Sequence, residues 1–312
     1  MQFLAVLTDS FRESRESRIF WIMLGASLLI LLFLTSIGIT EDQMRLLFGA
    51  VTIDLSSAGA AVKSNAGLAD WVIYLMFEFI VGWIGIILMI IATAHVIPSL
   101  MDSGVAGILL SKPISRGRLF SYKYISAMVF VFVQATIAFT GVFLVMGLCW
   151  NEWRPGSLLA IPAVVLVFSY VFCISALVGM KTRSAVASTM IAITAWVVFS
   201  IVSTLPQVFE YEELEHFKEN TLLYNSIRVI SWIPPKTGDT TYLVRRWANV
   251  PEDPLARALA RSGGNRNDME RAMSIDGQIM DELSVPFSIG TSLVFELLII
   301  SLCIWSFSRQ DF

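Results

Sequence analysis

Two carboxylates interrupt otherwise apolar stretches of the chain, and their side chains have the clearest capacity for chemistry. Glu78 lies in the apolar run 71–97, and Glu296 lies in the apolar run 286–307. A charged group inside a membrane span is costly, so such a residue suggests a contact with substrate, an ion or a polar partner. The alternative is a structural role, in which each carboxyl group is protonated or hydrogen-bonded to a neighbouring helix. Gln134, in a third apolar run, is a further candidate for lining a pathway.

Motifs for catalysis and nucleotide binding are missing from the sequence. It contains no GxxxxGK[ST] phosphate loop, no HExxH zinc motif and no GxSxG nucleophile motif. His95 stands beside a helix end marked by Pro98, and the three cysteines have no metal-ligand spacing. No basic stripe for nucleic acid appears. We therefore expect no enzyme activity, metal or cofactor in this chain, and any energy source must lie in another subunit.

The composition is that of a membrane protein. Of the 312 residues, 56% are apolar even without glycine, whereas a soluble domain is about 45–50% apolar with glycine included. A transmembrane helix needs about 20 apolar residues, and six runs meet this requirement. They are residues 19–39, 71–97, 125–148, 158–180, 185–205 and 286–307, and the third run can be extended back to Leu119 as a longer or tilted span. The sequence predicts an all-α polytopic membrane protein with six spans in a single domain, 1–312.

Lysine and arginine are unevenly distributed around these six runs. With the N-terminus inside, the inner segments hold ten of the 22 basic residues, and the two short outer segments hold three. The other nine lie in segment 206–286, and long segments cross a membrane largely regardless of their charge. This asymmetry predicts an integral membrane protein with both termini in the cytoplasm.

The stretch 95–124 is the sizeable interruption between the second and third runs. It holds a short apolar helix candidate, 105–110, between Gly104 and Pro113. A basic cluster follows, consisting of Lys112, Arg116, Arg118 and Lys123. A basic loop is expected on the cytoplasmic side, but a loop between two spans need not contain a helix. We therefore expect this segment to receive force from a cytoplasmic partner and to pass it to the flanking spans.

The first 18 residues predict a helix that lies on the inner membrane surface. Phe3, Leu4, Leu7 and Phe11 share one helical face, and arginines and glutamates alternate after them. An ordinary charged flank of the first span is the alternative interpretation.

Two outer segments differ greatly in length. Segment 40–70 predicts short strands or a compact irregular region. Segment 206–286 is too long for a plain connector. Its helix candidates are 210–219, 222–232, one that opens at Pro251, and one that runs from Asn267 to about Leu283. We expect residues 206–285 to form a small helical insert outside the membrane.

Several segments resemble the six-span permease subunits of type-2 ABC exporters, particularly the branch associated with multicopper-enzyme maturation. Residues 11–18 (FRESRESR) are similar to the FRE-xx-R-x-R lead into the first span of those proteins. Residues 102–116 resemble their pattern of an acidic residue, a glycine and then LL-x-[KR]-P-[IV]-S-R. The tail 307–312 is similar to the F-x-R-x-D ending, and 233–239 looks like the LP-containing segment after the fifth span.

This resemblance implies two contacts with a cytoplasmic ATPase. Residues 103–111 would form a coupling helix that docks in a cleft of the ATPase, and the N-terminal helix would be an elbow that also contacts it. The implied coupling residues are Asp102, Gly104, Val105, Ile108, Leu109, Leu110, Pro113 and Arg116. The implied elbow residues are Phe11, Arg12, Glu13 and Arg15. Gly107 replaces a usually polar position, and the insert is long for such a permease.

The resemblance implies a permease that exports an unidentified substrate with ATP and Mg bound in the partner ATPase. A second permease copy or a related chain would complete the pathway, and membrane lipid would surround it. Two alternatives stay open. One is a membrane scaffold or sensor, in which the insert acts as a receptor without transport. The other is an intramembrane enzyme that uses Glu78, Glu296 and His95, which no motif supports.

Overall fold

Six helical stretches in a computed structural model of the chain are long and apolar enough to cross a membrane. The structure describes residues 18–40, 43–54, 65–81, 83–101, 115–208, 234–248 and 284–309. The six candidate spans in this part are Arg18–Thr35, Gly67–Met101, Arg116–Cys149, Pro155–Thr182, Ala185–Val202 and Val285–Ser308. The predicted number of spans is confirmed by helix length and composition.

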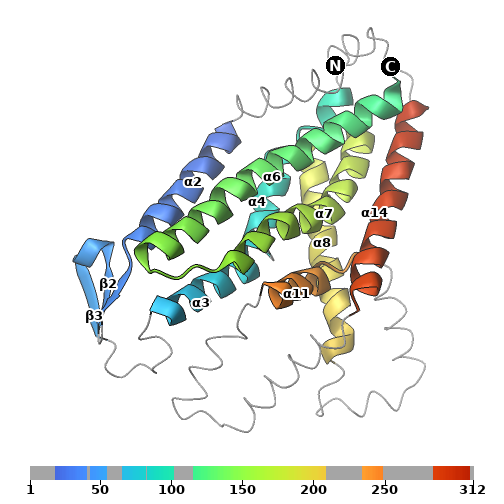
Figure 1. Ribbon diagram of the computed structural model, residues 1–312. Helices are drawn as coiled ribbons and strands as arrows, with labels where there is room; N and C mark the ends of the chain where they lie inside the picture. The colour runs from blue at the N-terminus through green and yellow to red at the C-terminus, as the bar shows by residue number, and fades with distance from the viewer. Residues whose placement is uncertain are drawn as a thin grey trace.

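The spans form a bundle with one central helix (Figure 1). Five of the main helices are α2 (Arg18–Thr35), α6 (Arg116–Cys149), α7 (Ala160–Thr182), α8 (Ala185–Val208) and α14 (Val285–Ser308). α7 contacts α6, α8 and α14, and a larger share of its span is buried than in the other described spans. Its small residues permit this packing, since a Cβ on Gly179 would stand 3.3 Å from the Cβ of Ser188. The core of the bundle therefore surrounds α7.

The two ends of the bundle are distinct. The start of α2, the turn between α7 and α8, and the end of α14 lie at one end (Figure 1). A small sheet lies beside the other end of α2. Successive spans therefore run in alternating directions through the bundle, as the predicted order of the spans requires. That the first end faces the cytoplasm stays a prediction.

The second span is broken, and the apolar run 71–97 that predicted this span gave no sign of the break. α3 (Asn65–Leu75) leads into a π-helical segment, η2 (Met76–Val81), and the helix resumes as α4 (Ile84–Thr93). Trp83, at the start of α4, has a non-helical backbone with φ −129° and ψ −79°. A Cβ at Gly85 would stand against the carbonyl group of Ile80, so the break brings backbone close to this glycine. Glu78 lies within η2.

A three-stranded antiparallel sheet follows α2. Its strands are β1 (Gly38–Thr40), β2 (Gln43–Leu46) and β3 (Val51–Asp54), in the order β1-β2-β3. In the register, Met44 stands opposite both Ile39 and Ile53. Trp150, at the end of α6, donates a hydrogen bond from Nε1 to the carbonyl oxygen of Ile37 at 3.0 Å. The sheet confirms the short strands expected between the first two spans and adds a small β element to the helical fold.

The third span begins earlier than the predicted residue 125. α6 starts at Arg116 and has 34 residues, which corresponds to a length of about 50 Å. Its first turns contain Arg118 and Lys123, and arginine and lysine are good helix formers. Hydropathy marks the part of a helix inside the membrane, and it therefore misses a charged extension.

Part of the predicted external insert packs against the spans. α11 (Thr237–Trp247) contacts α7, α8, α14 and η2. Asp239 in its first turn and Arg245 and Arg246 in its last turn match the signs that the helix dipole favours. The other helix candidates of the insert, the elbow segment 1–17 and the coupling segment 102–114 lie outside the described residues.

Replacement of Gly85 by alanine is expected to destabilise the bundle. The new Cβ would collide with the carbonyl group of Ile80, and overpacking of this kind costs about 1–3 kcal/mol. Thermal unfolding of the protein in detergent, followed by tryptophan fluorescence, measures the change in midpoint. Gly25→Ala is the matched control, because a Cβ on Gly25 would have nothing within 4 Å. An unchanged midpoint for both variants would show that the break tolerates a side chain here.

Candidate functional site: buried polar contacts between α11 and the spans

α14 carries one buried polar face in an otherwise apolar span. Ser288, Ser292 and Glu296 follow one another at intervals of four residues, so their side chains lie on the same side of the helix. The two serines are fully buried, and Glu296 is 8% exposed. On the other side, Leu297 and Leu298 are both more than 60% exposed. α14 therefore turns its polar face toward the bundle and its apolar face outward.

Glu296 joins three spans near the middle of α14. The Tyr124 hydroxyl of α6 donates to Oε1 at 3.0 Å, and the Ser169 hydroxyl of α7 donates to Oε2 at 3.0 Å. Tyr124 also lies 3.1 Å from the carbonyl oxygen of Ser169. Each carboxyl oxygen thus has a hydroxyl partner. This geometry agrees with the structural alternative for Glu296, in which its carboxyl group is hydrogen-bonded to neighbouring helices.

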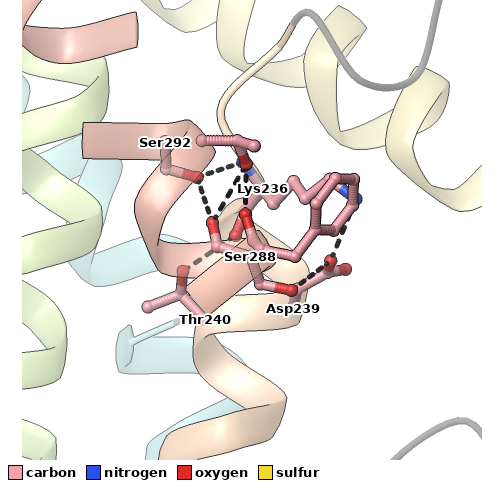
Figure 2. A network of polar contacts seen from close by, with 7 residues as sticks. Lys236, Asp239, Thr240, Ser288 and Ser292 are labelled. Atoms are coloured by element: carbon pink, nitrogen blue, oxygen red, sulfur yellow. Dashed lines mark hydrogen bonds and ion pairs between the residues drawn. The ribbon is translucent and has the colours of Figure 1, made fainter. Parts of the chain in front are cut away.

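A second polar cluster ties the start of α11 to the first half of α14 (Figure 2). The backbone N–H of Lys236 donates to Ser292 Oγ at 2.8 Å, and the Ser292 hydroxyl donates to the carbonyl oxygen of Ser288 at 2.8 Å. The Ser288 hydroxyl donates to Asp239 Oδ2 at 3.1 Å, and Lys236 Nζ lies 3.5 Å from the same oxygen. Asp239 is only 6% exposed, so both partners offset the cost of burying its charge.

Tyr170 lies between these two clusters. It is the neighbour of Ser169 on α7, and its hydroxyl lies near Thr240 of α11 and Ser292 of α14. The hydroxyl oxygen is buried without a partner in hydrogen-bonding geometry among the described residues. Polar side chains therefore continue from α11 to the centre of the last span.

The other end of α11 meets the broken second span. Arg245 is 4% exposed, and its Nη1 lies 3.7 Å from Oε2 of Glu78 in η2. The guanidinium carbon of Arg245 lies 5.0 Å from the ring centre of Tyr74 and 5.6 Å from that of Tyr242. The Glu78 side chain is 39% exposed. Glu78 thus faces a buried arginine, a partner that the sequence analysis did not predict.

Gln134 belongs to a third location, between α2 and α6. It is 2% exposed, and its Nε2 donates to Ser27 Oγ at 3.2 Å. Its Oε1 is buried without a partner in the part of the chain that the structure describes. Gln134 borders a cavity of about 120 Å³ between α2, η2, α4 and α6, whose walls are otherwise almost entirely apolar.

The structure does not bring the three candidate pathway residues into one site. Glu78 contacts α11, Glu296 contacts α6 and α7, and Gln134 contacts α2. Among the described residues, no group of three His, Cys, Asp or Glu side chains could hold a metal ion. Of the predicted coupling residues, the described part contains only Arg116, at the start of α6.

A comparison with protein families identifies the kind of membrane protein in which these contacts occur. A family model described as "ABC-2 family transporter protein" matches residues 4–312. The chain belongs to this family. As an ABC-2 protein it is a membrane permease of the ABC transporter type, and such permeases work with an ATPase partner. A search of curated proteins found no match. The resemblance to ABC-2 permeases is thus confirmed, and the multicopper-maturation branch stays a prediction.

The ABC-2 chain also contains polar residues that the sequence analysis missed. The four-residue spacing of Ser288, Ser292 and Glu296 in the sequence indicates one polar face on a helix. Lys236 and Arg245 gave no such signal, because they lie in a segment of mixed polarity that was assigned to an external insert. Their contacts depend on α11 folding back onto the spans.

The hydroxyl of Ser292 is expected to hold α11 in place. In the ABC-2 chain with Ser292→Ala, the part-buried N–H of Lys236 loses its acceptor, which costs on the order of 1 kcal/mol. Limited proteolysis and thermal unfolding in detergent measure this loss. Ser301→Ala is the matched control, since Ser301 lies on the same helix and is exposed, and its hydroxyl donates to the Leu297 carbonyl one turn earlier. Equal effects of the two substitutions would contradict the role of Ser292.

Proposed function

We propose that this chain is the membrane subunit through which a separate cytoplasmic ATPase drives the export of an unidentified substrate. The observation that carries the proposal is the family match over residues 4–312. The 312-residue sequence contains no phosphate loop of the GxxxxGK[ST] type, so ATP and Mg would be bound by the partner. The chain would supply the pathway, and the partner would supply the energy.

The coupling contact would be made by segment 102–114. Its implied docking residues include Leu109 and Leu110, and the elbow residues 11–15 would add a second contact. The segment is joined on one side to η3 (Pro98–Met101), whose Leu100 and Met101 are buried in the core. On the other side it enters α6, a continuous helix of 34 residues. A displacement of the segment would thus reach the far end of the bundle through α6.

The second span would respond differently from α6. It is broken around Trp83 and contains the π-helical segment η2, and such irregular turns are common sites of bending and function. A rigid helix and a broken span therefore leave the same coupling segment. We propose that their relative movement switches the permease between inward and outward access.

Large apolar surfaces on α2, α8 and α14 would face lipid or another permease chain. Only 11%, 17% and 22% of these spans, respectively, is buried in the described bundle. Two copies, or one copy and a related chain, would form the complete pathway in a bacterial-type inner membrane, with both termini in the cytoplasm. A sensor with a purely external receptor insert is less favoured, because α11 packs against the spans.

Changing Leu109 and Leu110 to aspartate is expected to release the ATPase. Two carboxylates in an apolar docking surface would have to be desolvated, and each loss of 1.4 kcal/mol weakens binding about tenfold. The tagged protein would be purified in mild detergent, and the bound partners would be measured by mass spectrometry and ATP hydrolysis. The expected result is at least about a tenfold loss of associated ATPase activity.

The matched control places two aspartates at the opposite end of the bundle. Leu47 and Phe48 are adjacent, 54% and 76% exposed, and lie beside the small sheet. The Leu47→Asp, Phe48→Asp protein should keep its ATPase. Wild-type protein that binds no ATPase would overturn the proposal, and equal binding by all three proteins would move the coupling contact away from 109–110.

A further inference from the structure

The guanidinium of Arg245 is buried with one edge unused. Its Nη1 faces Glu78, whereas Nε and Nη2 have no hydrogen-bond partner within the described part of the chain. The residue is 4% exposed, so water does not readily replace a missing partner. Leaving buried donors of a charged group unpaired costs more than leaving neutral donors unpaired. A partner for this edge is therefore expected in a functional state of the protein.

The unused edge has the geometry of an oxyanion receptor. Nε and Nη2 lie on the same side of the planar guanidinium, and their two N–H groups point in parallel. This arrangement matches the two oxygens of a carboxylate or phosphate group in a bidentate contact. Tyr74 of α3 and Tyr242 of α11 lie near the guanidinium at cation–π distances of 5.0 and 5.6 Å, and they hold it in place.

Glu78 is an incomplete partner for Arg245. The separation of 3.7 Å between Nη1 and Oε2 exceeds the 2.7–2.9 Å of a charge-assisted hydrogen bond. The Glu78 side chain is also 39% exposed, so it remains partly accessible while the arginine is buried. Glu78 can thus balance the charge of Arg245 without occupying the Nε and Nη2 edge.

Lys236, the residue that caps the N-terminus of α11, makes a contrast with Arg245. Lys236 Nζ pairs with Asp239 Oδ2 at 3.5 Å, and that carboxylate also accepts the Ser288 hydroxyl. Neither Lys236 nor Asp239 has a buried side-chain atom without a partner in the described part of the chain, whereas Arg245 has two. Among the described residues, the buried cationic nitrogens without a partner thus lie at the other end of α11, where α11 contacts η2 in the broken second span.

We propose that Arg245 binds the oxyanion group of a ligand, a phosphate or a carboxylate, between α11 and the second span. Nε and Nη2 hold the two oxygens, Tyr74 and Tyr242 orient the guanidinium, and Glu78, which faces Nη1, is the counter-ion whose negative charge opposes that of the ligand. The oxyanion belongs either to a free solute or to the headgroup of an anionic lipid. This inference goes beyond the proposed function and does not require the ATPase to be bound.

Thermal unfolding of the purified full chain, without any ATPase, tests the site. In one arm, inorganic phosphate or acetate is titrated into protein in neutral detergent, with ionic strength held constant by sodium chloride. In the other arm, the protein is placed in phosphatidylcholine nanodiscs with or without phosphatidylglycerol. The expected result is a saturable rise in the unfolding midpoint on the order of 2–4 °C in at least one arm. The arm that responds identifies the source of the oxyanion.

Three variants separate anion binding from a purely structural ion pair. Arg245→Lys keeps the charge but removes the two parallel N–H donors. It should raise the concentration of anion or anionic lipid that gives half of the midpoint shift at least about tenfold. Arg246→Lys is the matched control, since this neighbouring arginine is exposed, and its response should equal that of wild type. Glu78→Gln removes the competing carboxylate and should lower the anion concentration that gives half of the midpoint shift.

The opposite pattern would overturn the proposal. A structural ion pair predicts that Glu78→Gln lowers the midpoint, and that neither phosphate, acetate nor phosphatidylglycerol shifts it in wild type or in Glu78→Gln. A response of Arg245→Lys equal to that of Arg246→Lys would likewise overturn it, because it would reflect a general effect of anions. The wild-type and Glu78→Gln titrations decide the question even if Arg245→Lys does not fold.

Discussion

The buried polar face of α14 can exist only where other elements supply its hydrogen-bond partners. In a bundle that spans a membrane, an unpaired polar group costs several kcal/mol. Tyr124 and Ser169 supply the partners of Glu296, and Lys236 and Asp239 supply those of Ser292 and Ser288. This requirement explains why α11, which follows a long segment after the fifth span, returns to the bundle. The last span thus supplies the hydrogen bonds that hold the start of α11.

α11 also connects this rigid contact to the least regular part of the bundle. Its first turn is fixed to α14, whereas its last turn faces Glu78 in η2. The second span is interrupted just after η2, where the backbone of Ile80 approaches Gly85. A change in the angle of this span would therefore alter the contact between Glu78 and Arg245 first. The contacts with α14 would hold the other end of α11 in place.

The sequence predicted those features that depend on local pattern. Six apolar runs gave the number of spans, and the two carboxylates inside them were recognised at once. The break in the second span was missed because apolar residues continue through it without a change in hydropathy. The partners of Glu296 were missed because Tyr124 is 172 residues away in the chain, and no single-sequence pattern encodes such a contact. α11 was missed because its mixed polarity resembles that of an exposed segment.

The two ends of α11 differ in a way that bears on mechanism. Lys236 pairs with Asp239, whereas the Nε and Nη2 edge of Arg245 has no partner among the residues that the structure describes. An oxyanion on that edge would compete with Glu78, and Glu78 belongs to the π-helical segment of the broken span. Any ligand that binds more tightly to one geometry of this span must favour that geometry. Occupancy at Arg245 and bending of the second span would then be thermodynamically linked, and the link would act at the far end of the bundle from the coupling segment.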